Sequence, residues 1–199
     1  MTDKPVLLLD IDGVVNAMSK KVPVKVWPAD VWHWTKVQAP DGGQYPIFWA
    51  TPVVDWLTRL HESGDVEIRW HSTWQEASLE VGEAVGLPVF KVHECPEYAE
   101  GHANGSALVA RLLREGLPRW WKYPAAERVL TDEGSRTIWI DDDIDYQLSA
   151  STRRTLEAVY NIELVCPDER TGLMPKHMRR VDAVILDWKE NPGGALSGS

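Results

Sequence analysis

The chain has 199 residues, of which 44% are hydrophobic and 26% charged, a composition typical of a soluble globular protein with one sizeable core. A net charge of −9 argues against a broad basic surface for extended nucleic acid, and no apolar run is long enough to span a membrane. The two cysteines lack the spacing of a disulfide framework or a zinc site, and the N-terminal residues show no signal sequence, so a cytoplasmic protein is expected.

The first expected element is a buried strand that leads into two carboxylates. Four apolar residues at 6–9 precede Asp10, Asp12 and Gly13. This pattern predicts a parallel strand that ends at the carboxyl edge of a sheet, where open α/β sheets bind their ligands. Carboxylates this close repel each other unless a cation lies between them or one is protonated, and a hard cation such as Mg²⁺ meets that need.

Residues 16–50 have the pattern of an inserted flap, not of a helix. The alternating segment 22–28 indicates an edge strand, and the segments 31–37 and 44–49 flank an Asp-Gly-Gly turn that predicts a β-hairpin. Because the insertion follows the acidic strand end directly, we expect the hairpin to cover the site. Its aromatic side chains either stack on a substrate or pack onto the domain. The candidates for substrate contact are Trp27, Trp32, Trp34 and Trp49.

The rest of the chain alternates helices with strands. The expected elements are a helix from an N-cap at Thr51 to Ser63, a strand over 66–71, a helix over 74–85, a strand over 88–92, helices over 106–115 and up to about 133, a strand over 137–140, a helix over 152–159, a strand over 162–166 and a helix over 175–187. This order predicts an α/β fold with a doubly wound, mostly parallel, five-stranded Rossmann-like sheet. We expect one domain over 1–188, with 16–50 as a flap or small cap, and a flexible tail over 189–199.

Polar residues follow three of the predicted strands. A doubly wound sheet brings such strand ends to one edge even when they are far apart in sequence. Thr73 has a second interpretation as the cap of the next helix, which favours Ser72, and Lys122 either reaches the same edge or lies on the surface. The strand-end residues are Asp10 with Asp12, Ser72 with Thr73, and the run from Asp141 to Asp143.

These residues resemble a known family. The segments Asp10-Ile-Asp-Gly-Val and Ile140-Asp-Asp, with Ser72 and Lys122 between them, are similar in order and setting to the four motifs of the haloacid dehalogenase (HAD) superfamily of phosphohydrolases. The segments Trp70–Trp74, Trp139–Asp143 and Arg170–His177 are similar, more narrowly, to the HAD domains associated with bacterial RNA-repair proteins.

The resemblance implies a Mg²⁺-dependent phosphomonoesterase that works through an aspartyl-phosphate. Asp10 would be the nucleophile, and Asp12 would be the general acid and base. The metal would neutralise charge on the phosphate and the carboxylates together. The implied metal ligands are Asp10, the backbone carbonyl of Asp12, Asp141 and Asp142, and the implied phosphate-binding residues are Ser72 or Thr73 and Lys122.

Three functions remain as alternatives at this stage. The family resemblance favours a nucleotide or a nucleic-acid terminal phosphate as substrate, whereas the acidic net charge favours a small metabolite such as a sugar phosphate. The third alternative is a catalytically silent HAD-fold binding protein. The pair of Asp10 and Asp12 weighs against it, because a binding protein has no need of a nucleophile together with an acid. No membrane partner is expected, and the pattern makes no prediction of oligomeric state.

Overall fold

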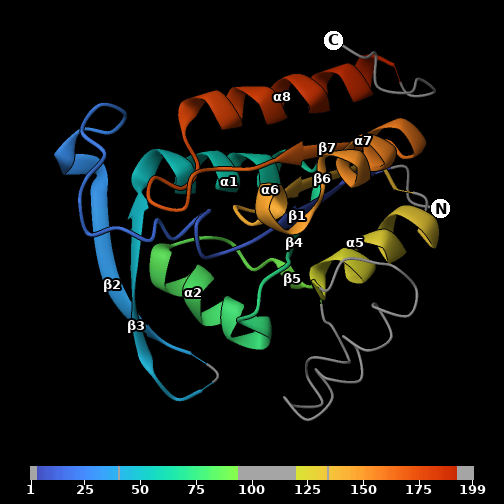
Figure 1. The fold of residues 1–199 in the computed structure, drawn as a ribbon. Helices are drawn as coiled ribbons and strands as arrows, with labels where there is room; N and C mark the ends of the chain where they lie inside the picture. Colours follow the sequence, from blue (N-terminus) through green and yellow to red (C-terminus); the bar gives the residue numbers. More distant parts are fainter. Residues whose placement is uncertain (1–3, 40, 94–119, 134, 192–199) are drawn as a thin grey trace.

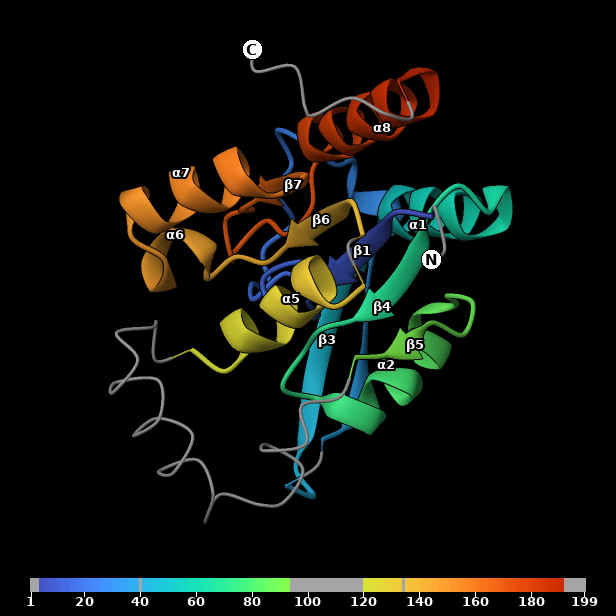
Figure 2. The same ribbon diagram turned by 90° about the vertical axis from the view of Figure 1, so that its right-hand side faces the viewer.

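Five parallel strands form the sheet on which the rest of the chain is arranged. The computed structural model describes residues 4–39, 41–93, 120–133 and 135–191, and its strands lie in the order β5-β4-β1-β6-β7 (Figure 1, Figure 2). Their bounds are Val6–Leu9 (β1), Glu67–Trp70 (β4), Lys91–Val92 (β5), Thr137–Ile140 (β6) and Ile162–Val165 (β7). The prediction of a doubly wound, Rossmann-like α/β sheet is confirmed.

Helices connect the strands, as the alternating pattern predicted. They are Thr51–Ser63 (α1), Ser78–Val85 (α2), Lys122–Thr131 (α5), Ile144–Gln147 (α6), Ala150–Val159 (α7) and Pro175–Glu190 (α8), with short 3₁₀ helices at Ala29–Val31 (η1) and Gln75–Ala77 (η2). Several predicted boundaries differ by a few residues. The N-cap of α1 is Ala50, because the preceding strand runs straight into the helix, and α2 begins at Ser78 because the residues before it form the 3₁₀ turn η2.

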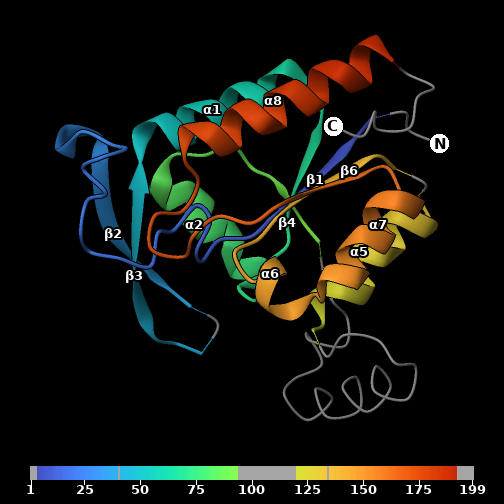
Figure 3. The same ribbon diagram turned by 45° about the horizontal axis from the view of Figure 1, so that its top comes forward.

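The apolar side chains of β1 supply both layers of the core. All four residues of this strand are buried. Leu7 and Leu9 pack with side chains of α1, α2 and α8, whereas Val6 and Leu8 pack with those of α5, α6 and α7. Figure 3 shows α1 and α8 side by side on one side of the strands and α5 with α7 on the other. Burial on both faces is what allows β1 to be continuously apolar.

The insertion after β1 contains the predicted antiparallel hairpin. Strands β2 (Trp32–Gln38) and β3 (Gln44–Ala50) pair along their whole length and stand beyond the carboxyl ends of the sheet strands (Figure 1). The predicted edge strand over 22–28 is wrong. The backbone turns there, with the amides of Val26 and Trp27 both donating to the carbonyl of Pro23. The proline-rich segment thus closes a turn instead of joining a ladder, since proline lacks the donor that pairing requires.

The C-terminal part of the described chain ends on α8. This helix extends to Glu190, three residues beyond its predicted end, and Lys189 in its last turn bonds both carboxylate oxygens of Asp65 at 2.9 Å. The predicted helix over 106–115 and residues 192–199 of the predicted tail lie outside the described residues. Among the described residues, no helix is both long and apolar enough to cross a membrane.

Candidate active site

The carboxyl ends of β1 and β6 bring two of the predicted acids together. Leu9 and Ile140 are paired in neighbouring parallel strands, and the amide of Asp10 donates to the carbonyl of Ile140 at 3.1 Å. Within the sheet, β4 is the neighbour of β1 on one side and β6 is its neighbour on the other. The carboxyl edge at such a reversal of strand order is the usual ligand site of open α/β sheets.

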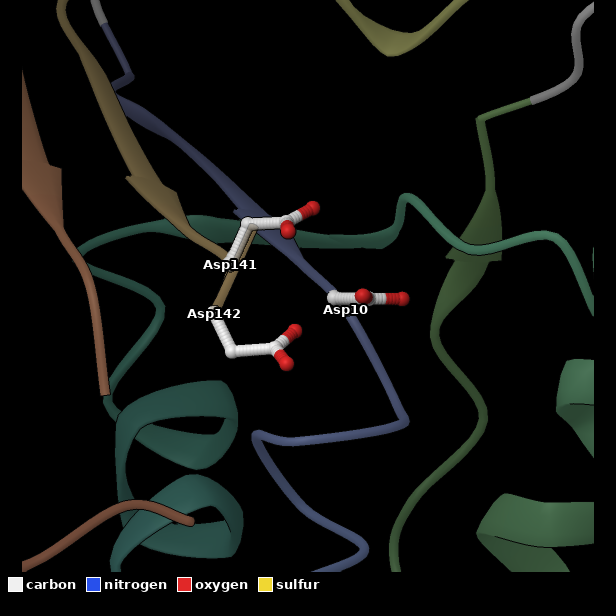
Figure 4. Close-up of side chains that lie close together, drawn as sticks. All are labelled: Asp10, Asp141 and Asp142. Carbon is white, nitrogen blue, oxygen red and sulfur yellow. The ribbon is translucent and has the colours of Figure 1, made fainter. Parts of the chain in front are cut away.

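Three carboxylates lie together at this edge. Asp10 follows β1, and Asp141 and Asp142 follow β6; one oxygen from each lies within 4.8 Å of the others (Figure 4). Asp10 and Asp141 are buried, and Asp142 is half-buried. An all-oxygen set of converging carboxylates has the chemistry that Mg²⁺ prefers, so these residues fit the metal that the family resemblance implies.

Lys122 lies inside this cluster. It is the first residue of α5, and its Nζ lies 2.6 Å from Oδ2 of Asp10 and 2.7 Å from Oδ2 of Asp141. Burial lowers the pKa of Lys122, but the charges of the two aspartates outweigh burial and raise it, so the ammonium stays protonated. When all three carboxylates are ionised, the one ammonium leaves two negative charges uncompensated, which a divalent cation would balance.

Burial and the charge of Asp10 raise the pKa values of the two acids that follow β6. Burial raises the pKa of Asp141, and the neighbouring charge of Asp10 adds to that shift despite Lys122. Burial and the charge of Asp10 also raise the pKa of Asp142 to about 7. Each of these carboxyls therefore favours its neutral form more than it would in water, because charge is costly in a buried site that already holds a carboxylate.

Gly13 makes room for one of these acids. Its φ of +69° lies in the left-handed region, and a Cβ built on it would lie 2.1 Å from Cγ of Asp142. Glycine is therefore required at this position twice over, for the turn and for the approach of the Asp142 carboxyl. The turn at Gly13 thus brings the backbone against the Asp142 carboxyl.

The Asp12 side chain lies outside the three-carboxylate cluster. Asn16 Nδ2 donates to its Oδ1 at 2.7 Å, and Trp74 Nε1 donates to its Oδ2 at 2.8 Å. Burial raises the pKa of Asp12, although the bonds from Trp74 and Asn16 oppose that shift. The side chain is therefore held separately from the candidate metal ligands, which suits a residue that would exchange protons.

Ser72 and Thr73 follow β4, on the other side of β1 from Asp141. The amide of His71 donates to the carbonyl of Leu9, so this segment reaches the same sheet edge. Ser72 is buried, with 2% of its surface exposed, whereas Thr73 is exposed. The alternative interpretation of Thr73 as a helix cap is wrong, because Trp74 and Ala77 precede the two helical segments and neither segment has a side-chain cap bond.

His71 connects the Ser72 segment to α5. Its ring is fully buried, and its Nε2 lies 3.2 Å from the backbone carbonyl of Lys122. Burial lowers its pKa well below the usual value, with the charges of His93 and Lys122 acting in the same direction. A neutral imidazole with its proton on Nε2 donates to that carbonyl. His71 therefore links the segment that carries Ser72 to the helix that carries Lys122.

The four tryptophans proposed for substrate contact occupy different environments. Trp27 is buried with 5% exposed, Trp34 is 63% exposed, and Trp32 and Trp49 are half-buried. Trp34 pairs with Phe48 across the hairpin, so it lies on the opposite face of the hairpin from Tyr45. Tyr45 packs edge-on against Trp74 at 6.3 Å between ring centroids.

Sequence patterns alone did not single out Asn16 or Trp74 as parts of the site. The available signals were positional: Asn16 begins the flap, and Trp74 lies two residues after Ser72. A contact across 62 residues, such as that between Trp74 and Asp12, leaves no periodic trace in the sequence.

No protein-family model and no curated protein matches the chain. One similar solved structure is a protein from Vibrio cholerae described as a 3-deoxy-D-manno-octulosonate 8-phosphate phosphatase. The two chains are 14% identical and superpose with a TM-score of 0.41, over 94% of this chain and 86% of that one.

Proposed function

We propose that this chain is a Mg²⁺-dependent phosphomonoesterase of the HAD type. The observation that carries the proposal is the buried cluster of Asp10, Asp141 and Asp142 with the ammonium of Lys122 between two of them. Buried carboxylates beyond the one that Lys122 can balance would destabilise a purely structural cluster. In a site for a divalent cation and a phosphate, the same carboxylates bind the cation. The acids next to Lys122 lie at the sheet edge where a ligand would enter.

Asp10 is the nucleophile in this proposal. Its Oδ2 is held by Lys122, which leaves Oδ1 as the oxygen that attacks phosphorus. The bond from Asp10 to phosphorus forms as the bond from phosphorus to the leaving oxygen breaks, and Asp12 gives that oxygen its proton. Water then attacks the phosphorus of the aspartyl-phosphate, Asp12 takes a proton from it, and inorganic phosphate leaves with Asp10 regenerated.

The surrounding groups lower the charge barrier to this attack. Lys122 and the hydroxyl of Ser72 would bind phosphate oxygens, since an anionic nucleophile approaches an anionic phosphate only where positive and donor groups are already in place. Bound Mg²⁺, held by Asp10, Asp141, Asp142 and the backbone carbonyl of Asp12, would supply charge neutralisation at the phosphate.

A nucleotide or a nucleic-acid terminal phosphate is the favoured substrate class. The hairpin beside the site carries aromatic side chains, and Tyr45 contacts the indole that bonds Asp12. A small-metabolite phosphatase is the alternative, which the net charge of −9 favours. A panel of 3′- and 5′-phosphorylated oligonucleotides, mononucleotides and sugar phosphates separates the two by the ratio of their kcat/KM values.

Hydrolysis of p-nitrophenyl phosphate tests the proposal. We expect release of p-nitrophenol that requires Mg²⁺ and is lost in Asp10→Asn, which keeps the shape of the side chain but not its nucleophilic charge. Asp55→Asn is the matched control, because Asp55 is exposed on α1 and the described structure gives it no polar partner. Full activity in Asp10→Asn would refute the nucleophile. Absence of any activity with Mg²⁺ in the natural protein would favour the catalytically silent binding protein.

A further inference from the structure

Both carboxylate oxygens of Asp12 accept a hydrogen bond from a side chain outside the catalytic cluster. Asn16, at the start of the flap, donates to Oδ1 at 2.7 Å, and Trp74, after β4, donates to Oδ2 at 2.8 Å. The donors come from segments 58 residues apart, and both bond the same carboxyl. Neither residue is among the four motif positions that carry the proposed reaction.

The orientation of the Asn16 amide is fixed by the hairpin. Its Oδ1 accepts the backbone N–H of Phe48 at 2.8 Å, and the next residue, Ala17, donates its own N–H to the carbonyl of Phe48 at 2.8 Å. A flipped amide would place its NH₂ against the N–H of Phe48, donor against donor. The bond to β3 therefore forces Nδ2 toward Asp12.

Trp74 is fixed by burial and by its chemistry. The side chain is 5% exposed, and its ring makes a T-shaped contact with Tyr45 of the hairpin at an interplanar angle of 82°. An indole N–H only donates, so this contact holds an oxygen of Asp12 in one place. Several other buried indoles of the chain, including Trp188, lack a partner for Nε1 within the described structure, so burial alone does not create such a bond.

We propose that Trp74 and Asn16 are positioning residues that hold the Asp12 carboxyl for proton transfer to the leaving group. This inference rests on the proposed phosphatase activity. Each carboxyl oxygen has two lone pairs, so one accepts the N–H and the other is free to carry the transferred proton. Two donors from opposite segments remove the rotational freedom of the carboxyl, and losses of alignment of about 1 Å cost about 10²-fold in rate.

The identity of the leaving group separates this role from a merely structural one. An alkoxide is a poor leaving group and depends on the proton from Asp12, whereas p-nitrophenolate leaves without much help. General acid catalysis contributes about 10²–10⁴-fold where it is needed. A variant that misplaces Asp12 therefore loses activity on glycerol phosphate but little on p-nitrophenyl phosphate, whereas a variant that damages the fold loses both equally.

The experiment compares kcat/KM for these two substrates in Trp74→Phe, which removes the N–H and keeps an aromatic ring. Because kcat/KM covers only the steps through formation of the phosphoenzyme, the later role of Asp12 as a base does not enter. We expect a loss of about 10–10²-fold on glycerol phosphate and of less than about threefold on p-nitrophenyl phosphate. Asn16→Asp, which keeps an acceptor for Phe48 but replaces the donor, should change the ratio in the same direction.

Trp188→Phe is the control, because it shortens a buried indole without removing a hydrogen bond among the described residues. Its ratio of the two kcat/KM values should equal that of the natural protein. Ratios within twofold of the natural value in both Trp74→Phe and Asn16→Asp would overturn the positioning role, and the Asn16 variant decides the matter if Trp74→Phe does not fold. Failure of the proposed function is distinct: the natural protein would then hydrolyse neither substrate.

Discussion

Replacing Lys122 with methionine tests the electrostatic balance of the site. The change keeps most of the side-chain volume and removes the ammonium that lies 2.6 Å from Asp10 and 2.7 Å from Asp141. All three side chains are at most 8% exposed, so water does not replace the lost partner. Removing one member of a buried ion pair costs about 3–5 kcal/mol, because the remaining charge is left uncompensated.

For a chain of this size, 1 kcal/mol corresponds to about 2–4 °C in Tm, so the expected decrease is about 6–20 °C. The assay is thermal unfolding, monitored by circular dichroism, in a buffer at pH 7.5 that contains a chelator. At pH 5 the decrease should be smaller, because Asp142, whose pKa burial and Asp10 raise to about 7, is then neutral and leaves less negative charge uncompensated. Activity with Mg²⁺ should be lost as well.

Lys189→Met is the matched control for this experiment. Lys189 bonds both oxygens of Asp65 at 2.9 Å, but its side chain is 54% exposed. An exposed ion pair contributes about 1 kcal/mol or less, so Tm should change little at either pH. A Lys122→Met protein that unfolds at the temperature of the natural protein at pH 7.5 would refute the idea that the ammonium balances the buried carboxylates.

Four further results are expected. Ser72→Ala should lower kcat/KM about 10²-fold through the loss of one donor to the phosphate, with little effect on Tm; an unchanged rate would exclude Ser72 from phosphate binding. Gly13→Ala should abolish Mg²⁺-dependent activity, since its Cβ would displace the carboxyl of Asp142, and a Mg²⁺ affinity equal to that of the natural protein, measured by calorimetry, would contradict this. In the presence of a chelator, the free energy of unfolding should fall as pH rises from about 4 through 7. The reason is that burial and Asp10 raise the pKa of Asp142 in the folded protein to about 7, above the unfolded value of about 3.9. Mg²⁺ at 100 times its Kd should raise the free energy of unfolding by about 2.7 kcal/mol at pH 8 and by less at pH 5. An equal increase at both pH values would count against carboxylate ligands.

The sheet and its acidic edge could be predicted because each leaves a local signal. The apolar run of β1 requires burial on both faces, and the hairpin has an Asp-Gly-Gly turn between two alternating segments. The meeting of Asp10 with Asp141 follows from the parallel alternation of strands and helices, since all parallel strands end at one edge.

The surroundings of Asp12 could not be predicted in the same way. The bonds from Asn16 and Trp74 depend on where the hairpin and the turn after β4 pack, which no periodicity encodes. The environments of Trp27 and Trp34 differ for a similar reason. Trp27 lies in a proline-bounded turn that folds into the core, and Trp34 lies on the outer face of the hairpin, although both are tryptophans in alternating segments.

Trapping of the phosphoenzyme tests the central claim most directly. The natural protein is mixed with substrate and Mg²⁺, quenched in acid during turnover, digested and analysed by mass spectrometry. We expect the mass of one phosphoryl group on the peptide that contains Asp10, and its absence from Asp10→Asn and from reactions without Mg²⁺. A protein that turns over substrate while this peptide remains unmodified, or that carries the phosphoryl group elsewhere, would contradict the assignment of Asp10 as the nucleophile.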